Sequence, residues 1–273
     1  MKKLFLTLLC AAGFMAANAA VEGALPGKFS IGEGRYVVFS KGNMQYQAVN
    51  YVWRFAEHQY DFVGGIKEGN VSYAFDKCNN ARIDKYYDGW IDLFGWGTAK
   101  EPTLNSEESR DYAEFAEWGD NTILNGGILR EGWRTLSSDE WHYLLISRPN
   151  ADNLRSQATV NNVHGYILLP DSWQLPKKLT FMPNANSWSA NVYSASQWKA
   201  MEKAGAVFLP AAGYRSGQQL GALNANGFYW SSNFYEEKPE DARGIYFGEK
   251  KFGPSDHEKR YLGLSVRLVL DVQ

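Results

Sequence analysis

The amino-acid sequence predicts an α+β fold in which strands outnumber helices. Aromatic residues are frequent, with 10 Trp, 16 Tyr and 15 Phe among 273 residues, and the chain has 26 Gly. Many rings combined with many glycine turns are typical of short strands packed by aromatic side chains. Two short segments carry helix-start signals, and several strand-like segments lie around them. Two helices beside several short strands that do not alternate with them favour α+β.

The first strands are expected close to the N-terminus. Residues 35–46 (RYVVFSKGNMQY) have the pattern of a strand, a Lys-Gly turn and a second short strand. The aromatic-rich segment 51–60 is expected to continue that sheet. Residues 88–98 (DGWIDLFGWGT) set three large rings between glycines, which predicts a compact, buried loop.

The first helix is expected to begin at Ser137. Glu140 follows three residues later, so the two side chains can form a capping box with each other's backbone amides. The apolar residues after this start recur at helical spacing, which predicts a buried face. That face consists of Trp141, Leu144 and Leu145.

The second helix repeats this pattern at Ser194 and Gln197. Trp198 and Met201 share one face, and Gly205 is expected to end the helix. The strand-like segments around and after it are residues 165–170, 206–209, 227–231, 244–247 and 264–270.

The composition becomes acidic over residues 100–120. Residues 100–120 contain seven acids but only Lys100 and Arg110 as bases. The favoured interpretation is a solvated loop or a short surface helix. A cation site is the alternative, although the D-x-D-x-D-G spacing of a calcium-binding EF-hand loop is absent.

Residues 1–19 have the pattern of a signal peptide. Two lysines precede a short apolar run, and the A-N-A triplet at 17–19 fits a small-x-small cleavage site. The run is too short for a membrane-spanning helix, and no later segment reaches the apolar length of a membrane span. We therefore expect an exported protein in the periplasm, at the cell surface or secreted, with no transmembrane segment. Residues 20–273 are expected to form a single domain with a core at about 35–270.

Charge and cysteine content narrow the possible partners. The formal net charge is −2, so no basic surface points to a nucleic-acid partner. Cleavage would leave Cys78 alone, which excludes a disulfide framework. Lys77 and Arg82 lie near it in the sequence, but a lone thiol is the favoured interpretation over a nucleophile.

No catalytic or metal-binding motif stands out in the chain. A nucleophile elbow, a P-loop and a dinucleotide fingerprint are all absent. The histidines form no H-x-x-x-H or H-E-x-x-H pattern. They are His58, His142, His164 and His257. We expect no metal and no cofactor. Paired carboxylates for glycoside hydrolysis stay open, because the spacing of acids in space cannot be read from the sequence.

The C-terminal tail, residues 229–269, interleaves charges with rings. Seven acids fall between Glu236 and Glu258, and six bases between Lys238 and Arg260. Rings beside adaptable polar groups are what recognition surfaces use, including faces that stack on sugars. An ordinary charged hairpin is an equally good interpretation of this composition.

Several segments together resemble a known family. The tail segments 229–233 (YWSSN), 242–247 (ARGIYF) and 260–269 (RYLGLSVRLV) resemble the closing signature of the Fibrobacter succinogenes major paralogous domain family and its Bacteroidota relatives. Residues 132–141 (GWRTLSSDEW) resemble a helix start of the same branch, which it shares with formylglycine-generating enzymes. Further similar blocks are residues 39–46, 89–98 and 204–215.

The resemblance implies a C-type-lectin-like fold, with twisted antiparallel strands and two flanking helices. The last strand would return beside the first, and the ligand-facing surface would lie between Asn233 and Arg260. The residues implied to be core are Trp230, Ile245, Phe247, Val266 and Leu268.

Two departures from the relatives limit the chemistry. The catalytic branch uses paired cysteines near the C-terminus, whereas Cys78 lies far upstream. The calcium-dependent lectins use E-P-N or Q-P-D with W-N-D, whereas this chain has M-P-N at 182–184 and no W-N-D. Neither sulfatase-activating oxidation nor a calcium-bridged mannose site is therefore expected.

The favoured hypothesis is an exported, non-enzymatic binding module for a glycan or for a protein of the cell envelope. The alternatives are a carbohydrate-active or oxidative enzyme on the same scaffold and a structural subunit of a surface appendage. The candidate ligand-binding residues are Asn233, Tyr235, Arg243, Tyr246, Phe252 and His257.

Overall fold

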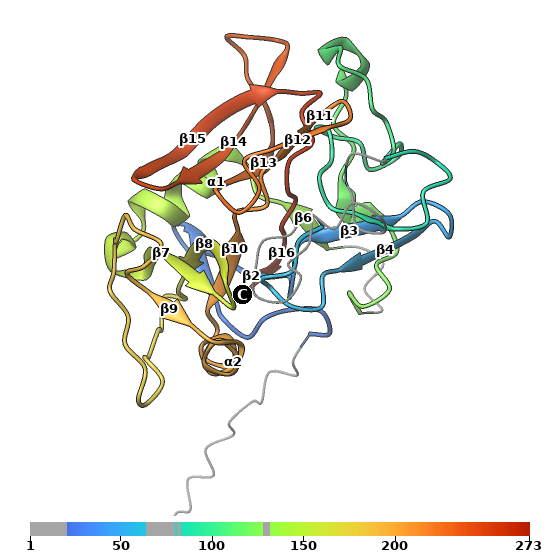
Figure 1. The fold of residues 1–273 in the computed structure, drawn as a ribbon. Coiled ribbons are helices and arrows are strands. Elements are labelled where there is room, and N and C mark those ends of the chain that lie inside the picture. The colour runs from blue at the N-terminus through green and yellow to red at the C-terminus, as the bar shows by residue number, and fades with distance from the viewer. Residues whose placement is uncertain (1–20, 64–79, 81–82, 128–131) are drawn as a thin grey trace, which may run out of the picture.

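The computed structural model describes residues 21–63, 80, 83–127 and 132–273. In these residues the chain forms short helices and five small sheets, which confirms the α+β prediction (Figure 1). The predicted signal peptide and Cys78 lie outside the described residues. No helix in the described ranges is long and apolar enough to cross a membrane.

The strands are β1 (Phe29–Gly32), β2 (Arg35–Phe39), β3 (Met44–Gln47), β4 (Val52–Phe55), β5 (Trp90–Ile91), β6 (Trp133–Thr135), β7 (Arg155–Val160), β8 (Val163–Leu168), β9 (Val192–Tyr193), β10 (Val207–Pro210), β11 (Tyr214–Ser216), β12 (Gln219–Gly221), β13 (Asn226–Phe234), β14 (Asp241–Gly248), β15 (Lys251–Lys259) and β16 (Leu268–Val272). The α-helices are α1 (Ser138–His142) and α2 (Ala195–Lys203). Shorter turns are the 3-10 segments η2 (Ser109–Tyr112), η3 (Trp118–Asp120) and η5 (Ala151–Leu154), and the π-helical turn η4 (Tyr143–Ser147).

The last strand closes the fold. β16 lies between β2 and β6 in the order β1-β2-β16-β6 and is antiparallel to both neighbours. Figure 1 accordingly places the C-terminus beside β2. Lys28 Nζ also donates a hydrogen bond to the carbonyl oxygen of Gln273 at 2.6 Å. The expectation that the last strand returns beside the N-terminal segment is confirmed.

The predicted pairing of residues 35–46 is wrong in one respect. β2 and β3 both form, but β2 pairs with β1 and β16, whereas β3 pairs with β4 and β5. The turn between them is held by other segments, because the Ser40 amide donates to Leu268 and the Lys41 amide to Gly23. Segment 51–60 contributes β4, which does extend the sheet of β3.

The predicted core residues are all buried. Trp230, Ile245 and Phe247 are at most 2% exposed, and Val266 and Leu268 are fully buried. The loop at 88–98 also lies inside, as expected. Its backbone carbonyl at Phe94 accepts from Trp230 Nε1 at 2.7 Å. Its own Trp96 Nε1 donates to the carbonyl of Ser231 at 3.0 Å. These two indole hydrogen bonds, one in each direction, fix β13 against the loop.

Both predicted capping boxes are present. Ser137 Oγ accepts from the Glu140 amide at 3.2 Å, and the Glu140 carboxylate accepts from the Ser137 amide at 2.9 Å. Ser194 and Gln197 make the same exchange at the start of α2. Gly205 follows the end of α2 with φ of +99°, a conformation that favours glycine.

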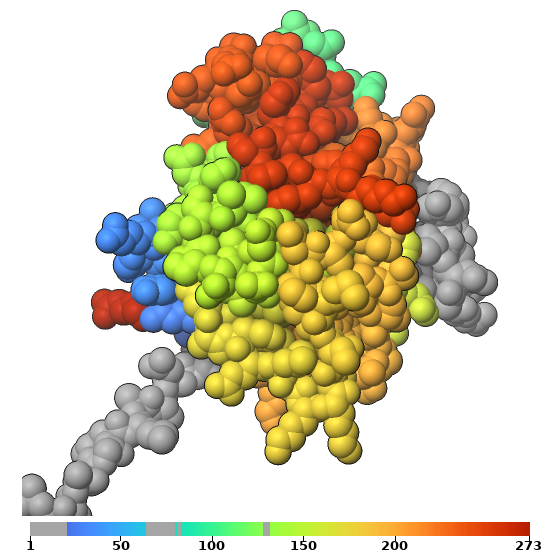
Figure 2. Space-filling view, turned by 90° about the vertical axis from the view of Figure 1, so that its left-hand side faces the viewer, coloured from blue at the N-terminus to red at the C-terminus, as the bar shows by residue number. Residues whose placement is uncertain are grey.

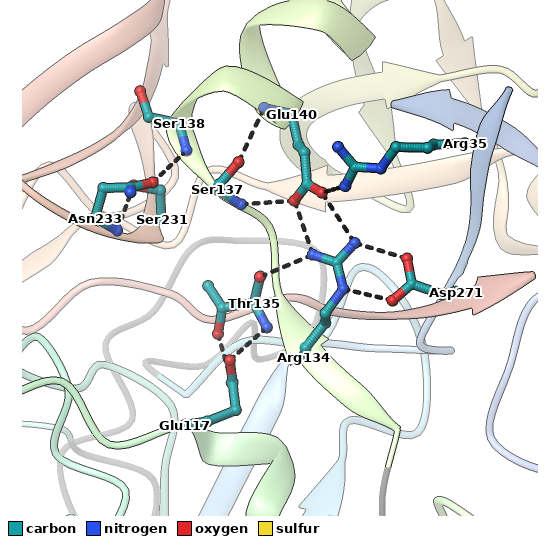
Figure 3. A network of polar contacts seen from close by, with 10 residues as sticks. All are labelled: Arg35, Glu117, Arg134, Thr135, Ser137, Ser138, Glu140, Ser231, Asn233 and Asp271. Carbon is teal, nitrogen blue, oxygen red and sulfur yellow. Dashed lines mark hydrogen bonds and ion pairs between the residues drawn. The ribbon is translucent and has the colours of Figure 1, made fainter. Parts of the chain in front are cut away.

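The Glu140 carboxylate also joins α1 to the closing sheet (Figure 3). Arg134 donates to both of its oxygens, at 2.7 and 3.0 Å, and Arg35 binds it from β2. Arg134 holds Asp271 of β16 as well, with two bonds of 2.7 Å. Burial alone would raise the pKa of Glu140, but the bonds and charge of Arg134 outweigh it and lower that pKa.

The acidic stretch forms surface turns, as the favoured interpretation expects. Six of its seven acids are exposed. Glu117 is the exception, because it accepts from the Thr135 amide at 2.9 Å and from Thr135 Oγ1 at 2.7 Å. Burial raises the pKa of Glu117. The stretch therefore supplies one inward-facing carboxylate that fixes β6.

Replacing Glu140 by glutamine should destabilise the fold. The uncharged amide removes one of the two carboxylates that pair with Arg134 and weakens the acceptor for the Ser137 amide, so we expect a loss of roughly 3 kcal/mol in the free energy of unfolding at pH 7. Because the pKa of Glu140 is lower in the folded state, its contribution is present above the ordinary glutamate pKa and is lost as the pH falls through the folded value. Denaturant unfolding at pH 7 and at pH 4 measures both effects.

The matched control is Glu33→Gln, which removes an exposed carboxylate from the β1–β2 turn. Its unfolding free energy should equal that of the wild type. Equal stability of Glu140→Gln and Glu33→Gln at pH 7 would contradict the role given to the Glu140 network.

Candidate ligand-binding site

The β14–β15 hairpin presents two faces of different chemistry. The register pairs Arg243 with His257 and Ala242 with Glu258. Successive side chains on a strand point to opposite faces, so these two pairs lie on opposite sides of the hairpin. The side that bears Arg243 and His257 is called the Arg243 face below, and the side that bears Glu258 is called the Glu258 face.

On the Arg243 face a tyrosine ring contacts two nitrogen-bearing side chains. The Tyr235 ring stacks on His257 with 4.2 Å between the ring centroids and 19° between the planes. The Arg243 guanidinium carbon lies 4.6 Å from the same ring centroid, in cation–π contact. Tyr235 donates its hydroxyl hydrogen to Glu237 at 2.7 Å, and this bond is the main cause of a raised Tyr235 pKa. The three side chains are therefore held in one arrangement.

Asp241 pairs with His257 of this stack and with Lys259 beside it. Its side chain is 5% exposed, with one oxygen 2.9 Å from His257 Nδ1 and the other 2.9 Å from Lys259 Nζ. Lys259 also binds Glu240 at 2.8 Å. The hydrogen bond to Glu240 is the main cause that raises the Lys259 pKa, and the bond to Asp241 adds to it. A buried carboxylate with two basic partners orients both of them.

Asn233 connects the hairpin region to α1. Its side-chain oxygen accepts from the Ser138 amide at 2.8 Å (Figure 3). The amide of Asn233 donates to Ser231 Oγ within β13 at 3.3 Å. The first residue of α1 is thus fixed against the end of β13.

A cleft of about 480 Å³ lies between α1 and the end of the β13–β15 sheet. This volume is within the range of pockets that bind small ligands. Figure 2 shows the orange and red surface of β13–β15 lying against the yellow-green surface of α1 and η4. Phe234 is 51% exposed there, so an apolar ring stands beside charged and amide groups. The residues lining this α1 cleft are Ser138, Asp139, His142, Asn233, Phe234, Glu236, Arg243 and Ser255.

The structure brings four of the six predicted site residues together. Asn233 and Arg243 line the α1 cleft. Tyr235 and His257 adjoin it through their contacts with each other, and Tyr235 also contacts Arg243.

Tyr246 and Phe252 lie elsewhere. Tyr246 packs against Phe228 with the ring centroids 5.0 Å apart, and burial, Asp256 and Glu258 raise its pKa. Phe252 stacks on Tyr166 at 5.0 Å and 2°, at the other end of the hairpin. Strand alternation and the length of the hairpin separate these two rings from the cleft.

The cleft also contains residues that the sequence analysis does not single out as ligand-binding. Ser138 and His142 come from α1, about a hundred residues upstream of β14, so no local pattern joins them to the tail. Phe234 sits between two predicted residues, and its exposure follows from its place at the strand end. Within residues 21–63, 80, 83–127 and 132–273, no group of three or more His, Cys, Asp or Glu is placed to hold a metal ion.

Comparisons of the chain with known proteins identify no related protein. No family model matches the chain, and neither a curated protein nor a solved structure matches it significantly. The resemblance to the Fibrobacter succinogenes major paralogous domain family stays a prediction that rests on the quoted motifs.

Replacing Asp241 by asparagine should loosen the stack. The amide keeps the shape but removes the charge that holds Lys259 and His257, so we expect a loss of about 2 kcal/mol in the free energy of unfolding. The nuclear Overhauser contacts between the rings of Tyr235 and His257 should weaken in the same variant. Glu249→Gln, at an exposed acid in the β14–β15 turn, should change neither quantity. Intact ring contacts in Asp241→Asn would rule out the supporting role.

Proposed function

We propose that the chain is an exported, non-enzymatic binding module on a C-type-lectin-like scaffold. Its ligand site is the α1 cleft together with the adjoining Tyr235 and His257, and its ligand is a glycan or a protein of the cell envelope. The observation that carries the proposal is the stack of Arg243, Tyr235 and His257, which is fixed beside a cleft that contains an exposed ring.

The side chains at the cleft suit recognition of a polar, ring-shaped ligand. Phe234 offers an apolar face on which a sugar ring or an aromatic side chain can stack. Arg243 and Asn233 present hydrogen-bond donors, and Asp139 and Glu236 present acceptors. Because the Ser138 amide holds Asn233 and Asp241 holds His257, these two side chains lose little conformational entropy on binding.

The scaffold assignment rests on topology and motifs. The return of β16 beside β2 brings the two ends of the chain together, as the C-type-lectin-like fold requires. Helices α1 and α2 correspond to the two expected flanking helices. The tail motifs that resemble the family supply β13, β14 and the approach to β16.

Two other functions from the sequence analysis stay predictions. A carbohydrate-active or oxidative enzyme would turn over a substrate, and a subunit of a surface appendage would bind a partner strand at a sheet edge. Turnover of a bound glycan, or a stable homopolymer of the mature chain, would distinguish these from a binding module.

The test is binding of residues 20–273 to a glycan array and to envelope material from the native cell. Protease treatment of the envelope separates the two ligand classes, because it removes a protein ligand and leaves a glycan. With the ligand so identified, the double variant Phe234→Ala, Arg243→Gln should lose at least about tenfold in affinity, since it removes one stacking ring and one charged donor.

The matched controls keep the same types of change outside the cleft. Lys251→Gln removes an exposed cation from the far end of the hairpin, and Tyr51→Ala removes a ring that is 79% exposed. Both should bind as the wild type does. Unchanged affinity in the cleft variant, or equal losses in the controls, would show that the ligand binds elsewhere.

A further inference from the structure

A second pocket lies on the Glu258 face of the hairpin. Its volume is about 510 Å³, and Tyr214, Leu220, Phe228, Glu258 and Leu262 contribute to its lining. It belongs to the opposite side of β14–β15 from the α1 cleft, because Glu258 and His257 are neighbours on one strand. The Glu258 pocket is thus separate from the site of the proposed function.

The walls of the Glu258 pocket are aromatic and aliphatic. Tyr214 and Phe228 meet edge to face, with ring centroids 5.8 Å apart and planes at 89°. Phe228 in turn packs on Tyr246. Aromatic rings carry negative charge on their faces and therefore attract cations as well as apolar groups.

Glu258 is the charged group among the residues that line this pocket. Its side chain is half-buried, and no hydrogen bond or ion pair links its carboxylate to any of the described residues. Burial is the main cause that raises the Glu258 pKa to about 7, and the charges of Asp256 and Asp241 add to it. A half-buried carboxylate among other acids favours a positive partner.

The cations near the Glu258 pocket are committed to other groups. Lys259 binds Glu240 and Asp241 on the Arg243 face. Arg215, between the pocket residues Tyr214 and Ser216 on β11, is not among the lining residues, and its Nη1 donates to Asn105 and to the Gly217 carbonyl. Tyr246, whose pKa is raised by burial and by the charges of Asp256 and Glu258, is neutral at pH 7.

We propose that the Glu258 pocket binds an organic ammonium group carried on an apolar stem. The ammonium pairs with the Glu258 carboxylate, and the stem lies against Tyr214, Phe228 and the leucines. A neutral stem would leave the carboxylate unpaired, and an anionic ligand would meet the like charge of Glu258, with Asp256 on the same strand face. The pocket therefore selects for positive charge rather than for apolar surface alone.

Binding of this kind depends on pH with a defined sign. The ammonium pairs with the ionised carboxylate, so affinity rises as the pH rises through the Glu258 pKa of about 7. An alkylamine stays protonated over this range, because amines of this type titrate near pH 10. Binding at lower pH is accompanied by release of the Glu258 proton.

The test titrates residues 20–273 with n-hexylamine at pH 6 and pH 8, using calorimetry and two-dimensional NMR. 1-Hexanol and hexanoate serve as neutral and anionic ligands of matched length. We expect hexylamine to bind at least fivefold more tightly at pH 8 than at pH 6, and more tightly than either matched ligand. Shifts should concentrate at Tyr214, Phe228 and Glu258.

Variants separate the Glu258 pocket from the α1 cleft. Glu258→Gln should lose at least tenfold in hexylamine affinity at pH 8, whereas Glu249→Gln and Arg243→Gln should retain it. Affinity that is equal at pH 6 and pH 8 in the wild type would overturn the proposal without any variant. So would the absence of hexylamine binding, or equal binding by 1-hexanol. Because Arg243→Gln tests the cleft and Glu258→Gln tests the pocket, failure of one proposal is distinguishable from failure of the other.

Discussion

The buried Glu140 carboxylate is the interaction on which the rest of the structure depends. A charge in a protein interior is costly unless donors surround it, and here Arg134, Arg35 and the Ser137 amide provide them. Those donors come from β6, β2 and the start of α1, and Arg134 also holds β16 through Asp271. One carboxylate thus fixes a five-residue helix that would not be stable alone. Since α1 lines the cleft through Ser138 and His142, the geometry of the candidate site is set by this network.

The period of a β-strand explains how one hairpin carries two kinds of surface. On the Arg243 face, basic and aromatic side chains are paired with Asp241 and with one another. On the Glu258 face, a carboxyl that has no partner in the described part of the chain lies among rings and leucines. The tail is close to neutral in total charge. Side-chain alternation nevertheless places its paired charged groups on the Arg243 face and the Glu258 carboxylate on the other face. Composition alone cannot show this, because it averages over both faces.

Local signals in the sequence predict local structure well. The two capping boxes, the buried strand at 165–170 and the tryptophans of the core follow from patterns within a few residues. Pairing is different, because it depends on distant partners: the turn after β2 is held by Leu268 and Gly23, so β2 and β3 enter different sheets. β15 is not among the predicted strand segments, and only the charged-hairpin interpretation covers it, because most of its residues are polar and Pro254 interrupts the strand pattern. The Glu258 pocket also lies beyond sequence analysis, because its walls come from four separated segments.

The central claim is that ligand recognition takes place at the α1 cleft, where the Glu140 network positions α1 against the β13–β15 sheet. Hydrogen–deuterium exchange of residues 20–273, with and without the ligand identified from the envelope, tests this most directly. The account predicts slower exchange in peptides that cover α1, the β13–β14 turn and the middle of β15, with little change in β3 and β4. Protection confined to β3 and β4, or spread evenly over the chain, would contradict it.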